Sequence, residues 1–269
     1  MPSSGDFNIL FIGDVIGRPG RNALEMLLPG IKKEFSIDFT IANGENAAGG
    51  FGLTRKLAED LTSLGVDVLT SGNHIWDRRE VLGDLDSMTN VLRPLNYPPR
   101  LPGRGRATFE ASGGIKVCVV NLAGRVFMQP LDCPFRSVDA ALADGQDVIT
   151  LVDVHAEATS EKVALGWYLD GRVTAVVGTH THVQTADHRV LPGGTAYITD
   201  VGMTGPWDSV IGIDKAAIIQ RFLTGIPARF EVSPGDVRLC AVVISVDSRS
   251  RKATAIERLD RPVEGARIG

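Results

Sequence analysis

The sequence predicts an α/β fold in which a largely parallel β-sheet packs against a second sheet. Short apolar runs alternate with longer amphipathic segments through the first part of the chain, which is typical of β-α-β units. These runs are apolar on both faces, as expected of central strands that other layers cover. The last part of the chain is rich in strand patterns instead, and these predict the second sheet.

Six apolar runs are the predicted strands of the first part, and they lie at residues 8–14, 38–43, 66–73, 116–122, 147–155 and 174–180. The first run has no basic stretch before it, so it predicts a strand and not a secretion signal. No apolar stretch approaches the ~20 residues that a membrane-spanning helix needs.

Three amphipathic segments between the strands predict helices. Residues 54–64 have an apolar face, with Thr54 as the N-cap. Residues 159–170 have the same periodicity. The face that we expect this second segment to bury holds Val163, Ala164, Trp167 and Tyr168. Residues 21–35 form the third segment, which the Pro-Gly pair at 29–30 is expected to kink or divide.

Two hairpin patterns fill the last part of the chain. Residues 189–202 predict a short hairpin, and residues 237–260 predict two long strands joined by a Ser-Arg-Ser turn. The sequence has no internal repeat. We therefore expect a single domain over 1–269, with a small excursion around 84–112 where proline and glycine are frequent.

The composition excludes several classes of protein. The 269 residues are 43% hydrophobic and 22% charged, which is ordinary for a globular protein with a large core. A net charge of −4 argues against a general nucleic-acid or membrane surface, so we expect neither a stable nucleic-acid complex nor membrane binding. The three cysteines form no Cys-x-x-Cys pair, which favours a reducing, cytoplasmic location. The sequence leaves room for a homo-oligomer.

Polar side chains follow the predicted strands at the points where the strands end. They are Asp14, Glu45, Asn46, Asn73, His74, His155, His180 and His182. In a parallel α/β sheet the carboxyl ends of the strands share one edge, where ligands bind. We therefore expect these side chains to meet at one rim.

The side chains at this rim suit divalent metal ions. Carboxylate oxygen, amide oxygen and neutral imidazole nitrogen bind hard or borderline metals, and no cysteine is among them. There are too many ligands for one ion but about enough for two. Residues i and i+2 of an extended segment point the same way, so His180 and His182 are expected to reach neighbouring metals from one strand end. Paired ions clamp the oxygens of an in-line phosphoryl displacement, which makes phosphoester hydrolysis the predicted chemistry.

Five stretches of the sequence, taken together, resemble one family. The stretches "FIGDVIGRPGR", "ANGENAAGGFG", "SGNHIWD", "HAEATSEK" and "GTHTHVQTAD" are similar to the motifs of the YmdB-like branch of the calcineurin-like metallophosphoesterases. The resemblance covers nearly the whole chain. It implies a four-layer α/β/β/α sandwich, in which two packed mixed sheets are flanked by helices.

The resemblance also implies roles for the rim residues. One metal would be surrounded by Asp14, Glu45, Asn46 and His182, and the other by Asn73, His155, His180 and the bridging Glu45. His74 would be the catalytic residue that protonates or stabilises the leaving oxygen. The implied cofactors are two divalent ions per chain, iron or manganese, with zinc as a further choice. No other substrate-binding residue is predicted.

Two positions depart from the wider superfamily, and the YmdB-like branch shares both departures. Asp14-Val15-Ile16 stands where the superfamily has Asp-x-His, and Gly44-Glu45 stands where it has Gly-Asp-x-x-Asp. One metal therefore loses a histidine, and a glutamate takes the bridging position.

The resulting prediction is a metal-dependent phosphodiesterase that hydrolyses 2′,3′- and 3′,5′-cyclic nucleotides by attack of a metal-bridging hydroxide. The alternative is a regulatory protein that binds a nucleotide at the same metals with little turnover. A serine hydrolase is disfavoured because Val15 stands where the nucleophile would be. A zinc deaminase would use His155 and Glu157 as its His-x-Glu motif, but no Pro-Cys-x-x-Cys follows.

Overall fold

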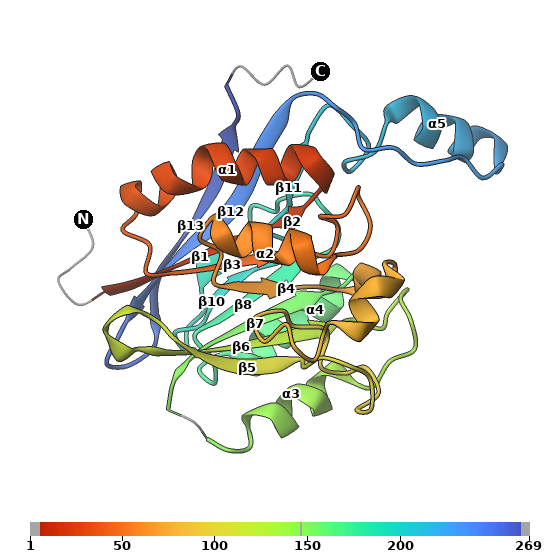
Figure 1. Cartoon of the computed structure of the whole chain (residues 1–269). Helices are drawn as coiled ribbons and strands as arrows, with labels where there is room; N and C mark the ends of the chain where they lie inside the picture. The colour runs from red at the N-terminus through yellow and green to blue at the C-terminus, as the bar shows by residue number, and fades with distance from the viewer. Residues whose placement is uncertain (1–5, 146, 265–269) are drawn as a thin grey trace.

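Two mixed β-sheets pack face to face, and helices cover their outer faces (Figure 1). The computed structural model describes residues 6–145 and 147–264. The four-layer sandwich that the resemblance implied is confirmed.

The first sheet has seven strands, in the order β2-β11-β12-β1-β3-β4 with β13 paired to β12. Their bounds are β1 Asp6–Ile12, β2 Asp14–Val15, β3 Phe39–Asn43, β4 Val68–Thr70, β11 Met203–Pro206, β12 Val237–Asp247 and β13 Ala253–Pro262. The second sheet has six strands, in the order β5-β6-β7-β8-β10-β9. Their bounds are β5 Arg106–Glu110, β6 Lys116–Ala123, β7 Ile149–His155, β8 Ala175–Thr179, β9 Arg189–Val190 and β10 Ala196–Ile198.

Five α-helices and three short 3₁₀ helices are present in the described ranges. They are α1 Gly17–Glu34, α2 Arg55–Ser63, α3 Pro134–Leu142, α4 Thr159–Leu169, α5 Lys215–Thr224, η1 Asn73–Trp76, η2 Arg79–Gly83 and η3 Ser112–Gly114. Thr54 caps α2 as predicted, because its hydroxyl accepts from the backbone N–H of Leu57 at 3.3 Å. No helix of the described residues has the length and apolar character to cross a membrane.

Three large apolar clusters fill the spaces between the four layers, and a fourth, small cluster includes Ala23 of α1. In β1, Leu10 and Ile12 belong to the cluster shared with α1 and α2, while Ile9 and Phe11 belong to the cluster between the sheets. A third cluster lies between the second sheet and the helices α3 and α4. Buried strands that face two cores must be apolar on both sides, which explains the unbroken apolar runs of the sequence.

The last strands extend both sheets and do not build a new one. The β12–β13 hairpin joins the first sheet, where β12 lies antiparallel to β1 with Ile9 opposite Ile244. The β9–β10 hairpin joins the second sheet through β8. The expectation that one parallel sheet holds all the polar strand ends is therefore wrong, because β1, β3 and β4 belong to one sheet and β7 and β8 to the other.

Helix α1 runs through the Pro-Gly pair without a break, so the predicted division is wrong. Pro29 is exposed, and its missing N–H would have bonded to the carbonyl of Glu25 on the same exposed side. Water can satisfy that carbonyl. The helix keeps its apolar face toward the sheet, with Leu24, Leu28 and Ile31 buried.

Helix α4 buries the face opposite to the predicted one. Trp167 and Tyr168 are 50% and 42% exposed, while Glu161 and Lys162 are buried. Each buried charge has partners: Glu161 accepts backbone N–H groups of residues 125–126, and Lys162 reaches a carboxylate of the adjacent layer. Hydrophobic periodicity cannot predict such a face, because polar side chains replace apolar ones on it.

Residues 84–112 cross from the first sheet to the second. Val91 forms a parallel bridge to Leu69 of β4, Leu92 forms one to Arg104, and β5 then pairs with β6. The buried side chain of Arg93 donates to the carbonyls of Pro94, Leu101 and Pro102 within this segment. A single domain with an excursion here stays a prediction.

Candidate metal centre

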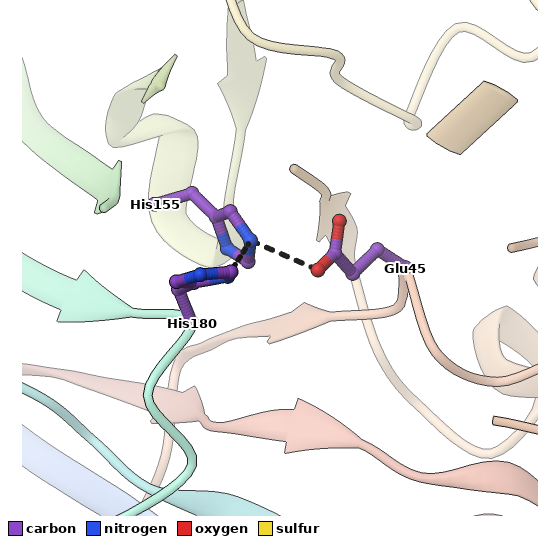
Figure 2. Close-up of side chains that lie close together, drawn as sticks. All are labelled: Glu45, His155 and His180. Carbon is purple, nitrogen blue, oxygen red and sulfur yellow. Dashed lines mark hydrogen bonds and ion pairs between the residues drawn. The ribbon is translucent and has the colours of Figure 1, made fainter. Parts of the chain in front are cut away.

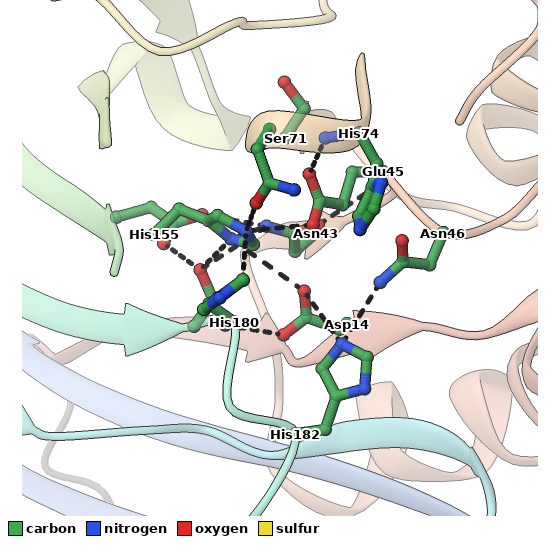
Figure 3. A network of polar contacts seen from close by, with 12 residues as sticks. Asp14, Asn43, Glu45, Asn46, Ser71, His74, His155, His180 and His182 are labelled. Atoms are coloured by element: carbon green, nitrogen blue, oxygen red, sulfur yellow. Dashed lines mark hydrogen bonds and ion pairs between the residues drawn. The ribbon is translucent and has the colours of Figure 1, made fainter. Parts of the chain in front are cut away.

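The structure brings all eight rim residues together at the facing edges of the two sheets. Figure 3 labels seven of them, and Asn73 is placed by its contact with His155. Asp14, Glu45, Asn46, Asn73 and His74 follow β1, β3 and β4 of the first sheet, and His155, His180 and His182 lie at the ends of β7 and β8 of the second. The site therefore depends on the packing of one sheet against the other, as well as on the order of the strands within each sheet.

One group of candidate ligands is centred on His155 (Figure 2). Its Nε2 lies 2.9 Å from Glu45 Oε1, 3.0 Å from His180 Nδ1 and 3.2 Å from Asn73 Oδ1. Suitable ligand atoms of Glu45, His155 and His180 all lie within 4.8 Å of one another. Two imidazole nitrogens and a carboxylate at this spacing can share one cation.

A second group lies beside the first and contains Asp14, Asn46 and His182. Asp14 Oδ1 is 4.0 Å from His182 Nε2, and the Asn46 amide nitrogen is 3.2 Å from the same atom. A half-turn of the Asn46 amide brings its oxygen toward His182. This group can hold a second cation next to the first.

Unpartnered buried oxygens support the fit of the site to metal ions. Among the residues that the structure describes, Asp14 Oδ1 and Asn46 Oδ1 are buried without a hydrogen-bond partner. Glu45 Oε1 has only its ion pair with His155. Leaving such oxygens buried without hydrogen bonds is costly, and divalent cations would satisfy them. The donor set, oxygen and imidazole nitrogen without sulfur, matches iron, manganese or zinc.

The ring of His155 is oriented by a relay on the side away from the ligands. Its Nδ1 lies 2.9 Å from the hydroxyl of Thr179, which donates at 2.8 Å to Asp153. Nδ1 therefore carries the proton, and Nε2 keeps its lone pair for a cation. Burial raises the pKa of Asp153 to about 7.

The other two imidazoles are also oriented by their second nitrogen. His182 donates from Nδ1 to the carbonyl of Ile211 at 3.0 Å, which leaves Nε2 free. His180 lies with Nε2 3.1 Å from Glu157 Oε2, which leaves Nδ1 facing His155. His180 is therefore expected to bind through Nδ1, unlike the other two.

The loop that holds His180 and His182 differs from the predicted extended segment. β8 ends at Thr179, and the two histidines have φ angles of 99° and 64°. Such values are uncommon for residues other than glycine, and they need support from the surroundings. Asp200 supplies it, because its Oδ2 accepts both the backbone N–H and the hydroxyl of Thr181 at 3.1 and 2.7 Å.

Electrostatics favour a positive charge between Glu45 and His155. Burial opposes the charged form of His155, but Glu45, Asp14 and Asp153 outweigh it and raise the pKa of His155 to about 9. Burial also opposes the charged form of Glu45, but His155 and His74 outweigh it and lower the pKa of Glu45 to about 2. A metal cation would take the place of the imidazolium proton.

Gly72, the glycine of the "SGNH" stretch, is required for steric reasons. A Cβ on Gly72 would lie 2.0 Å from Cδ2 and 2.2 Å from Nε2 of His155. No real Cβ tolerates such a contact, so the metal-facing edge of the imidazole can reach its position only beside glycine.

Gly72→Ala is therefore expected to displace His155 and to reduce bound metal by at least about tenfold, as when the support of a metal ligand is lost. Metal content after reconstitution and dialysis measures this effect. Gly30→Ala is the matched control, since a Cβ there meets nothing within 4 Å. Full metal content in Gly72→Ala protein would contradict the role given to Gly72.

His74 lies at the border between the ligand groups and a cavity of about 730 Å³. Its backbone N–H donates to Glu45 Oε2 at 3.0 Å, and its Nδ1 lies 2.8 Å from Asp77 Oδ2. The ring of Phe51 packs edge-on against the imidazole ring of His74, with the two ring centroids 5.0 Å apart. The side chain is partly exposed, so it can reach a bound ligand while Asp77 orients it.

Sequence reasoning missed the residues that orient the rim. Asp77 follows His74 by three positions in the "SGNHIWD" stretch, and a turn of 3₁₀ helix makes that spacing a contact. In the sequence, Glu157 is visible only as the glutamate of a His-x-Glu motif, whereas in the structure it pairs with His180. Asp200 gave no local signal, because its partners Thr181 and Lys162 lie far from it in sequence.

Solved structures share this fold along nearly their whole length. A crystal structure of a hypothetical protein from Thermus thermophilus has a TM-score of 0.90 at 47% identity, covering 95% of this chain and 99% of that one. A crystal structure of a novel phosphatase from Mycoplasma pneumoniae has a TM-score of 0.91 at 36% identity, covering 96% and 94%. The four-layer sandwich, with candidate ligands at its facing edges, identifies the chain as a protein of the metallophosphoesterase class.

The family within this class follows from sequence comparison. The 2′,3′-cyclic-nucleotide 2′-phosphodiesterase of Bacillus subtilis (strain 168) is 51% identical over 253 residues, which are 93% of this chain and 96% of that protein. The family model of the YmdB-like proteins matches residues 10–259. The chain belongs to the YmdB-like family.

Proposed function

We propose that this protein is a metal-dependent phosphodiesterase that hydrolyses cyclic nucleotides. The observation that carries the proposal is the convergence of unpartnered carboxylate and amide oxygens with three imidazoles beside one cavity. The name of the Bacillus subtilis relative supports 2′,3′-cyclic nucleotides as the first substrates to test. The 3′,5′-cyclic nucleotides are the second class.

Two divalent ions would be held by the two groups of ligands. Glu45, Asn73, His155 and His180 would hold one, and Asp14, Asn46 and His182, with Glu45 between the groups, would hold the other. Iron or manganese is the proposed metal, with zinc as the further choice. When bound, such ions supply an activated water nucleophile and neutralise phosphoryl charge.

His74 is the proposed proton donor to the leaving oxygen. It borders both Glu45 and the cavity, so it can approach a phosphate bound at the ligand groups. The carboxylate of Asp77 accepts from Nδ1 and fixes the ring with Nε2 directed away from it. No covalent intermediate is proposed, because the activated water that the ions would supply can attack phosphorus directly.

The test uses protein reconstituted with iron or manganese. Hydrolysis of 2′,3′-cyclic AMP, 3′,5′-cyclic AMP and bis-p-nitrophenyl phosphate is measured together with metal content per chain. Turnover with two ions per chain is expected. Fewer than two ions contradicts the paired site, and tight nucleotide binding without turnover would favour the regulatory alternative.

His74→Ala is expected to retain both metals and to lose turnover by roughly 10²-fold, as is typical when a general acid is removed. A substrate with a good leaving group, such as bis-p-nitrophenyl phosphate, should lose less than a cyclic nucleotide, because p-nitrophenolate departs without a proton. Equal losses on both substrates, or loss of metal, would contradict the assignment.

The location of the protein stays a prediction. The three cysteines, all in the described part of the chain, are buried and free, which is compatible with the cytoplasm.

A further inference from the structure

The cavity at the metal centre has a second, apolar end. It is formed by residues 207–232, here called the arm, which lie between β11 and β12 and include α5. Figure 1 shows α5 standing out from the two sheets. The arm residues that line the cavity include Val210, Ile211, Ile213, Ile218, Phe222 and Phe230.

The base of the arm is attached directly to a candidate metal ligand. The carbonyl of Ile211 accepts from His182, and Ile211 holds a φ of 46°, which is strained for a β-branched residue. Val210 and Ile213 bridge each other on either side of it, and Ile213 also bridges Val232. These contacts fix where the apolar end begins relative to His182.

The size of the cavity exceeds what a phosphate needs. Its volume of about 730 Å³ lies in the range of about 300–1,000 Å³ that is typical of small-molecule sites. The ligand groups occupy one end, so the rest of a substrate must lie along the arm. Of the described residues that line the cavity, Arg221 is the one lysine or arginine, and its guanidinium lies 4.9 Å from the ring centroid of Phe230.

We propose that the arm is the nucleobase subsite of this enzyme. The inference rests on the proposed function and specifies the part of the substrate that the arm recognises. The planar base stacks on Phe222, a cavity-lining ring that is 85% exposed. Arg221, beside it, offers guanidinium donors to the ring nitrogens or carbonyl oxygens of the base.

The test compares a substrate with a base and one without. Phe222→Ala is assayed on 2′,3′-cyclic AMP and on 1-O-methylribose 2′,3′-cyclic phosphate. The kcat/KM for cyclic AMP is expected to fall about tenfold more than that for the sugar phosphate, mainly through KM, because one base–aromatic stack is lost. Leu223→Ala is the matched control, since Leu223 is on the same helix and 77% exposed but does not line the cavity.

Equal changes on both substrates in Phe222→Ala would overturn the subsite, as would the same selective loss in Leu223→Ala. Calorimetry gives a second readout, in which adenosine 3′-monophosphate should bind about tenfold more weakly to Phe222→Ala while inorganic phosphate binds equally. Wild-type protein that cleaves neither substrate would refute the proposed function. The subsite is then judged by calorimetry alone, where unchanged binding of the nucleotide would refute it.

Discussion

Glu45→Gln is expected to lower turnover by roughly 10³-fold, the upper range for loss of one preorganised electrostatic group, and to remove at least one metal ion per chain. The carboxylate of Glu45 is the proposed bridge between the two ligand groups, and its Oε1 lies 2.9 Å from His155 Nε2 while its Oε2 accepts from the backbone of His74. Glutamine keeps the shape but removes the negative charge. It also points an amide N–H₂ either at the backbone N–H of His74 or into the space of a cation.

Metal content by elemental analysis and turnover of 2′,3′-cyclic AMP are the two measurements for Glu45→Gln. Glu25→Gln is the matched control, because Glu25 is an exposed carboxylate on α1 that does not line the cavity. Two tightly held ions together with wild-type turnover in Glu45→Gln protein would refute the bridging role of Glu45.

The strands and the polar residues that follow them could be predicted because their signals are local. Asp14 and Glu45 each follow a run that two core clusters must bury, and the chemistry of their side chains is visible in the sequence. The packing of one sheet on the other could not be predicted in the same way. It depends on contacts between strands that are distant in sequence and belong to different sheets, such as Ile9 of β1 and Leu151 of β7, which share the core cluster between the sheets.

The same limit explains the wrong face of α4 and the missed orienting residues. The sequence predicts that Lys162 is an exposed polar residue, because nothing in it identifies Asp200 as a partner. The two residues are brought together only by the packing of α4 on the sheet. The backbone conformation of His180 and His182 could not be predicted either. Both residues have positive φ angles, and no glycine or asparagine stands at either position to indicate them. Tertiary hydrogen bonds decide that conformation.

Lys162→Met is expected to lower the free energy of unfolding by about 3–5 kcal/mol, the usual cost of leaving one partner of a buried ion pair alone. Lys162 Nζ lies 2.7 Å from Asp200 Oδ2, and their side chains are 1% and 0% exposed. The ammonium also donates to the carbonyl of Thr179 at 2.8 Å. Urea denaturation monitored by circular dichroism measures the change.

Two further variants distinguish two causes of a stability loss in Lys162→Met: an unpaired buried charge and general damage to the fold. Lys162→Met combined with Asp200→Asn is expected to recover part of the loss, because no unpaired carboxylate then remains in the core. Lys215→Met breaks the exposed pair with Asp208 and should cost less than about 1 kcal/mol. If the double variant is no more stable than Lys162→Met, the unpaired charge of Asp200 is not the cause.

Asp200 also accepts hydrogen bonds from Thr181, which lies between two candidate metal ligands. A Lys162→Met protein that is as stable as wild type but binds less metal would therefore show that the Lys162–Asp200 pair maintains the geometry of the site and not the stability of the fold.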